Sequence, residues 1–279
     1  MGRIWNRSHH LGIGSRFTPA VRAIVIGTGA VFIAQIIVRL ALGSELHHKA
    51  VALFGLSVSG LSELHLWQPF TYLLLHDVSN PIHILGNMFL LWMFGGQVEE
   101  HIGTRRFVKL YVLGGLFAAA LSCVFYGIVG LWYPDQLGIP TIGASGAVCG
   151  VMAAFATLFP EEIILLFFLV PIKVKHAVLL LAGLEVLITL SGNSGIATVA
   201  HLGGFGFGFL FIRYGLQARN VFVRAYEQRS SRQSERDFEM QERLDKLLAK
   251  VAQKGMNGLS WRERAFLKKA SKRFRRRHE

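Results

Sequence analysis

Six apolar runs, each close to the length that crosses a lipid bilayer, follow one another through the first 216 residues. A membrane-spanning helix needs ~20 mostly apolar residues, and several of these runs are shorter or contain a polar residue. The pattern predicts six spanning helices, at about 21–42, 83–98, 107–131, 145–159, 174–190 and 197–216.

Two of the connecting segments are themselves apolar or aromatic. The segment 43–82 contains ELHLWQPFTYLLLH, an amphipathic and aromatic-rich stretch that favours a position in the membrane interface. The stretch LFFLVPI (166–172) directly precedes Lys173, and we expect it to be a connector on the cytoplasmic side.

The composition agrees with a membrane protein that carries a basic tail. The 279 residues are 52% hydrophobic and 17% charged, with a mean hydropathy of +0.42, whereas soluble domains carry about 25% charged residues. From Gln217 onward there are 18 Lys and Arg against 8 Asp and Glu, so this part supplies +10 of the net charge of +13.

The tail itself predicts two short helices. Apolar residues recur at helical spacing over 240–251, the sequence GMNG (255–258) interrupts them, and Ser260-x-x-Glu263 is a capping box for a second helix. We expect the closing cluster SKRFRRR (271–277) to meet anionic lipid headgroups. Nucleic acid is the weaker alternative for a membrane-tethered tail, and no nucleic acid is expected.

Basic residues alternate between the connectors in a way that predicts orientation. The positive-inside rule places Lys- and Arg-rich connectors in the cytoplasm, and an even number of spans then puts both termini there. The basic positions are Arg3, Arg7, Arg16, Arg22, Arg105, Arg106, Lys109, Lys173 and Lys175.

Three of the expected spans carry polar side chains at a similar depth below the outer membrane surface. His83 and Asn87 are four residues apart and therefore lie on one helical face. Ser145 opens the fourth span, and His201 lies about one turn into the sixth. Polar groups within spans are costly and tend to mark function, so this convergence predicts a site.

Small residues next to these positions allow the helices to approach closely. The spacings Gly146-x3-Gly150 and Gly204-x3-Gly208 follow Ser145 and His201 respectively, and small-x3-small faces bring helix backbones together in lipid. Each feature alone has a simpler explanation as ordinary packing. Their coincidence at one depth predicts a Ser145–His201 hydrogen bond.

The motifs HILGN (83–87), GASG (143–146) and AHLGGFGFG (200–208) resemble those of the rhomboid intramembrane serine proteases, in the same order. The stretches WQPFTYLLLH (67–76) and GGQVEEHIG (95–103) are also similar to segments of that family. The resemblance covers about residues 20–216, and the tail resembles the helical extension of some bacterial rhomboids.

This resemblance implies an all-α membrane protein, a six-helix rhomboid-like bundle followed by a soluble helical tail. It implies the boundaries 1–19 for an N-terminal segment, 20–216 for the catalytic domain and 217–279 for the tail.

It further implies cleavage of transmembrane protein substrates near the outer membrane face, with Ser145 as nucleophile and His201 as general base. His83, Asn87 and the Ser145 N–H are implied as the oxyanion hole, and Gly143 lies among the small residues packed around the site. No cofactor or metal is expected.

Two further expectations concern the surroundings of His201. We expect no acidic third member, because Glu185 falls within the fifth span and Asp135 in a loop. Cys149, one turn after Ser145, stands where relatives can carry a tyrosine packed against the catalytic histidine.

Other functions remain open on the sequence alone. A non-catalytic rhomboid-like protein that binds and routes membrane clients is the main alternative, and a transporter is another. We expect no removable signal peptide, and the compact body predicts the bacterial inner membrane as its location.

Overall fold

The computed structural model describes residues 17–166, 169–190, 196–215, 240–255 and 258–275. The chain divides into two compact units, Met1–Leu216 and Gln217–Glu279. The loop SGNSG (191–195) and the last two residues of the basic cluster, 276–277, lie outside the described residues.

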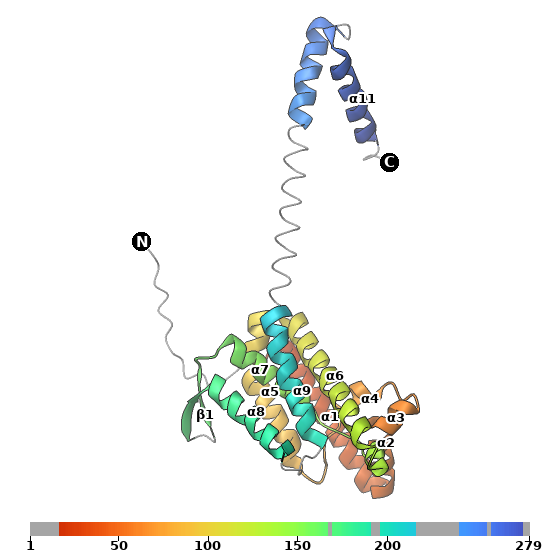
Figure 1. The fold of residues 1–279 in the computed structure, drawn as a ribbon, viewed down its shortest axis with the longest axis vertical. Helices are drawn as coiled ribbons and strands as arrows, with labels where there is room; N and C mark the ends of the chain where they lie inside the picture. The colour runs from red at the N-terminus through yellow and green to blue at the C-terminus, as the bar shows by residue number, and fades with distance from the viewer. Residues whose placement is uncertain (1–16, 167–168, 191–195, 216–239, 256–257, 276–279) are drawn as a thin grey trace. The chain divides into compact units, whose positions relative to one another are not determined.

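Six long helices form most of the first unit and occupy the six apolar runs (Figure 1). By length and composition, Pro19–Leu42 and Thr104–Val129 are suited to cross a membrane, and Ser145–Leu158 is a shorter apolar helix. The body is therefore mostly helical, while six spans stay a prediction. The helices are α1 (Pro19–Ala41), α5 (Pro81–Ile102), α6 (Thr104–Val129), α7 (Ser145–Leu158), α8 (Val174–Leu190) and α9 (Ile196–Leu210).

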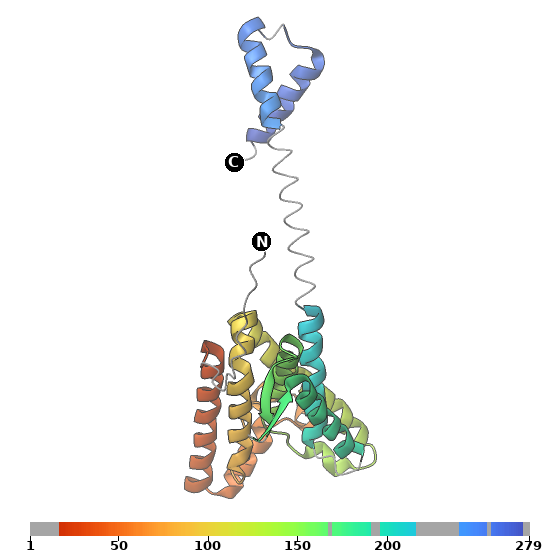
Figure 2. The same cartoon turned by 90° about the vertical axis from the view of Figure 1, so that its left-hand side faces the viewer.

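Helix α7 lies inside this bundle and is buried along most of its length (Figures 1 and 2). It packs against α5, α6, α8 and α9. Small residues dominate its sequence, and a helix without bulky side chains can be approached closely on several sides. Its first residue, Ser145, consequently lies where several helices meet.

A buried carboxylate joins α1 to the turn between α5 and α6. Glu99 accepts hydrogen bonds from the backbone N–H groups of Ala20 and Val21, and from the hydroxyls of Thr18 and Thr104. The free N–H groups at a helix N-terminus favour a negative partner. Glu99 thereby fixes the start of α1 against the end of α5.

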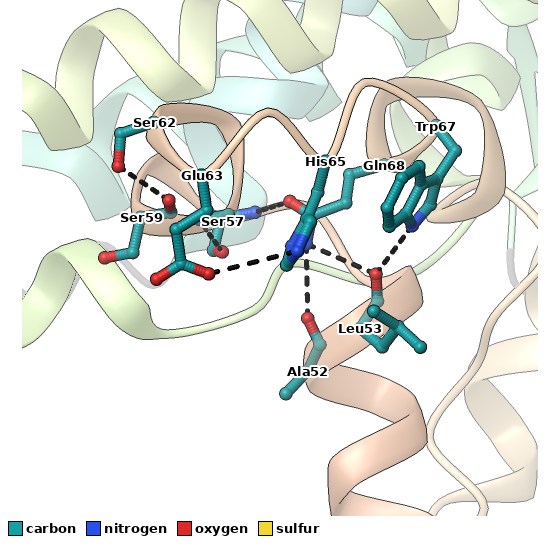
Figure 3. A network of polar contacts seen from close by, with 10 residues as sticks. Ala52, Leu53, Ser57, Ser59, Ser62, Glu63, His65, Trp67 and Gln68 are labelled. Atoms are coloured by element: carbon teal, nitrogen blue, oxygen red, sulfur yellow. Dashed lines mark hydrogen bonds and ion pairs between the residues drawn. The ribbon is translucent and has the colours of Figure 1, made fainter.

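The segment between α1 and α5 folds into three short helices, α2 (Ser44–Phe54), α3 (Val58–Ser62) and α4 (Gln68–Thr71). The fully buried side chain of Gln68 links them (Figure 3), accepting from the Ser57 N–H at 3.1 Å and donating to the carbonyls of Ala52 and Leu53. The indole N–H of Trp67 donates to the same Leu53 carbonyl at 2.9 Å. This segment is therefore a fixed layer rather than a loose loop.

The same layer holds the chain that leads into α7. Leu56 and Thr141 exchange two backbone hydrogen bonds, at 2.9 and 2.7 Å. The Gly143 N–H donates to the Tyr72 carbonyl at 2.9 Å. These bonds position Thr141 and Gly143, which lie four and two residues before Ser145.

The all-α expectation is wrong at one place, the apolar connector before α8. Strands β1 (Ile163–Leu166) and β2 (Val170–Lys173) form an antiparallel hairpin, in which Ile163 pairs with Lys173. β-Branched residues favour extended backbone, and Pro171 disfavours a helix here. Leu166 ends β1 and residues 170–172 belong to β2, so both ends of this run lie in strands, and the strand pair lies beside α8 (Figure 1).

The second unit contains a helix over 240–254 and a second helix, α11 (Trp261–Arg275). The predicted capping box is confirmed, because the Ser260 N–H donates to the Glu263 carboxylate at 2.7 Å and the Glu263 N–H to the Ser260 hydroxyl at 3.4 Å. Leu247 and Leu259 are buried, and Lys250 pairs with Glu263 at 2.8 Å. The two helices thus pack on each other as a small helical hairpin.

Candidate active site

The site is centred on a hydrogen bond between the first residue of α7 and a histidine of α9. The Ser145 Oγ and His201 Nε2 atoms are 2.8 Å apart. This distance lies within the 2.6–3.2 Å range that proton transfer from a nucleophile to a base requires. The two residues are 56 positions apart in the chain, so the contact depends on how α7 and α9 pack.

The glycines around the pair bring the two helix backbones into direct contact. A Cβ atom added to Gly204 would overlap the carbonyl oxygen of Gly146, and one added to Gly208 would overlap that of Gly150. On its other side, a Cβ at Gly146 would lie 2.7 Å from the Cβ of Ala118 in α6. Because no side chain fits between these backbones, Ser145 and His201 come within hydrogen-bond reach.

Gly143 makes room for His83 beside Ser145. Its φ of +120° is one that residues with a side chain rarely adopt. A Cβ there would be 2.9 Å from both Cε1 and Nε2 of His83 and 4.0 Å from the Ser145 Oγ. The imidazole of His83 therefore lies close to Ser145, in contact with the turn that precedes α7.

Asn87, one turn further along α5, is buried and held by a histidine that the sequence analysis did not single out. Its side-chain Nδ2 lies 3.1 Å from Nε2 of His76, and the Ala144 N–H points to the same nitrogen at 3.5 Å. The carboxamide has two hydrogens on Nδ2. One of them points to His76, so the other is not used by that histidine. His76 thus orients the amide of Asn87 next to the start of α7.

The surroundings of His76 determine its protonation state. Burial, and to a smaller degree the neighbouring His83, lowers the pKa of this histidine to about 4. Its Nδ1 lies 3.4 Å from the Leu74 carbonyl, and its backbone exchanges two 3.1 Å hydrogen bonds with Gln35 of α1. A neutral ring with Nδ1 protonated leaves Nε2 as the acceptor for Asn87. The sequence carries one signal for this role, because the residues next to His76 are mostly apolar.

The expectation that no acidic residue reaches His201 is wrong. The Oε1 atom of Glu185, in the second half of α8, is 2.8 Å from Nδ1 of His201. Glu185 lies in the predicted fifth span, but α8 presents its side chain toward α9 and not away from the bundle, so the contact with His201 is possible. Asp135 is exposed, in the 3-10 helix Pro134–Gly138.

Cys149 lies on the same side of α7 as Ser145, against α9. Its Cβ would be 3.2 Å from a Cβ built on Gly204, and its thiol is free. Within the described residues, no group of three or more His, Cys, Asp or Glu side chains is arranged to hold a metal ion.

Comparison with known proteins gives the family. Residues 63–218, more than half of the chain, match the Rhomboid domain, and residues 228–273 match a family of unknown function, DUF6576. The chain therefore belongs to the rhomboid family, which confirms the resemblance found in the motifs.

Several similar proteins have names that place them in mitochondria. Presenilin-associated rhomboid-like protein A of Danio rerio is 34% identical over 48% of this chain and 34% of its own length. RHOMBOID-like protein 12 of Arabidopsis thaliana is 31% identical over 44% of this chain and 39% of its own length. Rhomboid protein 1 of Saccharomyces cerevisiae is 38% identical over 30% of this chain and 23% of its own length. The chain thus matches about a third of the length of the first two.

These relatives overturn the expected location in a bacterial inner membrane, because their names place them in mitochondria. The expectation was wrong for a physical reason. Apolar spans show that a chain enters a membrane, whereas the choice of membrane depends on address signals that receptors recognise.

Proposed function

We propose that this protein is an intramembrane serine endopeptidase that cleaves transmembrane proteins with Ser145 as nucleophile and His201 as general base. The observation that carries the proposal is the 2.8 Å contact between Ser145 Oγ and His201 Nε2. A serine hydroxyl is a weak nucleophile unless an adjacent base accepts its proton. Membership of the rhomboid family supports the same assignment.

The reaction follows from the positions of these groups. The Ser145 Oγ attacks the scissile carbonyl carbon while its proton moves to Nε2 of His201, and His201 then gives that proton to the leaving amine. Water then attacks the acyl carbon while His201 takes its proton, and His201 returns that proton to the Ser145 Oγ as the ester bond breaks and the acid product leaves.

The negative oxygen of the tetrahedral intermediate needs hydrogen-bond donors that are already in place. The backbone N–H of Ser145 begins α7, where helix N–H groups are unpaired. The second hydrogen of the Asn87 amide and the His83 ring lie on the adjacent face of α5. We assign these three groups to the oxyanion hole, where loss of one donor costs ~3 kcal/mol.

The substrate of this site is a helix that must open before it is cut. A helix in lipid satisfies its own backbone hydrogen bonds, so its carbonyl groups are shielded from attack. Ser145 lies at the first turn of α7 and not in its middle, which favours cleavage near one membrane face in a six-span bundle. Substrates with glycine or proline near that face open most readily.

The test is chemical labelling combined with cleavage. We expect a fluorophosphonate probe to modify Ser145 in the wild type and to leave Ser145→Ala unlabelled. Cleavage of a model transmembrane substrate is expected to vanish in Ser145→Ala and His201→Ala, while both variants keep the thermal stability of the wild type. A folded wild type that neither reacts with the probe nor cleaves would instead indicate a rhomboid that binds clients without cutting them.

A further inference from the structure

The imidazole of His201 is held at both nitrogens by residues from two different helices. Its Nε2 faces Ser145 of α7, and its Nδ1 faces the carboxylate of Glu185 of α8, each at 2.8 Å. The side chains of His201 and Glu185 are only 19% and 23% exposed. Three helices thus contribute one residue each to a continuous chain of hydrogen bonds.

This arrangement selects one form of the histidine. A carboxylate only accepts hydrogen bonds, so the proton of a neutral imidazole lies on Nδ1. The lone pair of Nε2 then points at the Ser145 hydroxyl, as a general base requires. When His201 takes the serine proton, the carboxylate also faces the positive charge that forms on the ring.

The residue one turn after Ser145 also bears on the orientation of the His201 ring. Cys149 occupies the position one turn after Ser145, next to Gly204. A thiol is small and offers no flat surface against which an imidazole can stack. The hydrogen bond that Nδ1 of His201 donates to Glu185 fixes the plane of the ring.

The position of Glu185 on α8 makes this bond sensitive to where the helix lies. The buried residues of α8 are near its start, at Val174, Ala177 and Val178. Every described side chain over 179–188 is at least partly exposed. The half of α8 that carries Glu185 is thus less buried against the other helices than the half that follows the strand pair.

We infer that Glu185 is a positioning residue of the proteolytic reaction, which fixes the tautomer and plane of His201 and stabilises the charged ring. This inference rests on the proposed protease function. It also implies that the catalytic groups are complete only while α8 lies against α9, because displacing the second half of α8 removes the carboxylate from His201.

The experiment compares Glu185→Gln, Glu185→Leu and the control Leu184→Ala, whose side chain is 52% exposed on the same helix. In the full-length protein, kcat and KM are measured on one transmembrane substrate, together with the rate of Ser145 labelling by a fluorophosphonate and the melting temperature. We expect kcat and the labelling rate to fall at least ~10-fold in Glu185→Gln and further in Glu185→Leu, with KM unchanged. Gln retains partial function because its carbonyl can accept the Nδ1 proton, and Leu184→Ala is expected to match the wild type.

Three other results would overturn the inference. Labelling and kcat within twofold of the wild type in Glu185→Leu would show that His201 does not need the carboxylate. If Glu185→Gln were no more active than Glu185→Leu, and both melted at temperatures low enough to explain the lost activity, the role of Glu185 would be structural. A wild type that is not labelled at Ser145 would reject the protease function and this role together, whereas the first two results leave the protease function intact.

Discussion

Helices α8 and α9, which both pack against α7, are held in different ways. Helix α9 contacts α7 backbone to backbone, since Gly204 and Gly208 leave no room for a Cβ against Gly146 and Gly150. The second half of α8 has mostly exposed side chains, and Gly183 has nothing within 4 Å of an added Cβ. The proposed nucleophile and its proposed base therefore lie on two closely packed helices, and the proposed positioning residue Glu185 lies on a less buried one.

The largest effect is expected from a substitution that pushes α7 and α9 apart. Gly204→Ala places a methyl group on the carbonyl oxygen of Gly146, whereas Gly206, on the same helix, has open space around it. We expect Gly204→Ala to abolish cleavage and to destabilise the protein by about 3 kcal/mol, the upper end of overpacking effects. Gly206→Ala is expected to stay active and to gain ~0.5–1 kcal/mol of stability from better helix propensity.

Thermal unfolding and substrate cleavage measured on the two alanine variants decide this point. Equal behaviour of Gly204→Ala and Gly206→Ala would show that close contact between α7 and α9 does not set the Ser145–His201 distance.

The next effect concerns Asn87, the proposed oxyanion-hole donor on α5. Asn87→Ala removes the amide that His76 holds at 3.1 Å. Loss of one oxyanion donor lowers kcat by ~100- to 1,000-fold, with little change in KM. Leu85→Ala, on the exposed side of α5, is the matched control. If steady-state kinetics show the two variants to be equally active, Asn87 does not act on the transition state.

A smaller effect is expected from pH through His76. Its pKa is lowered to about 4 in the folded protein, from an ordinary value of 6.5. Between these values the unfolded chain binds the proton and the folded chain does not, so stability is complete above pH 6.5 and is lost as the pH falls toward 4. Burial lowers the pKa of His47 as well, which acts in the same direction.

Melting temperatures recorded from pH 7.5 to 4 test this dependence. His76→Leu is expected to flatten the curve, and an unchanged slope in that variant would assign the acid sensitivity to other groups. The carboxylate of Glu161, whose pKa the partners Lys173 and Lys175 lower to about 2, contributes only at more acidic pH.

The same contrast explains which features were predictable from the sequence. Helical ranges follow from apolar length, and the α7–α9 contact follows from small residues at a local spacing of four, so both can be recognised in the chain. The partner of Nδ1 in His201 depends on the rotation of α8 about its axis, which cannot be recognised from a sequence separation of 16 positions. His76 was missed because its importance arises from burial against Gln35 of a different helix. The hairpin at 163–173 was missed because an apolar run looks the same in a strand and in a connector.

The smallest effect is expected on α8. Gly183 lies two positions before Glu185, and a Cβ added there meets nothing within 4 Å. Gly183→Leu therefore places an apolar side chain on an open surface that is already lined by leucines, and better helix propensity offsets any loss. We expect stability within ~0.5 kcal/mol of the wild type, as for other surface changes, and cleavage within about twofold. Gly204→Leu, the same substitution on α9, is expected to lose both stability and cleavage activity. A strong loss in Gly183→Leu, seen in melting and cleavage assays, would mean that this surface of α8 is packed in the working protein and that the two helices are equally constrained.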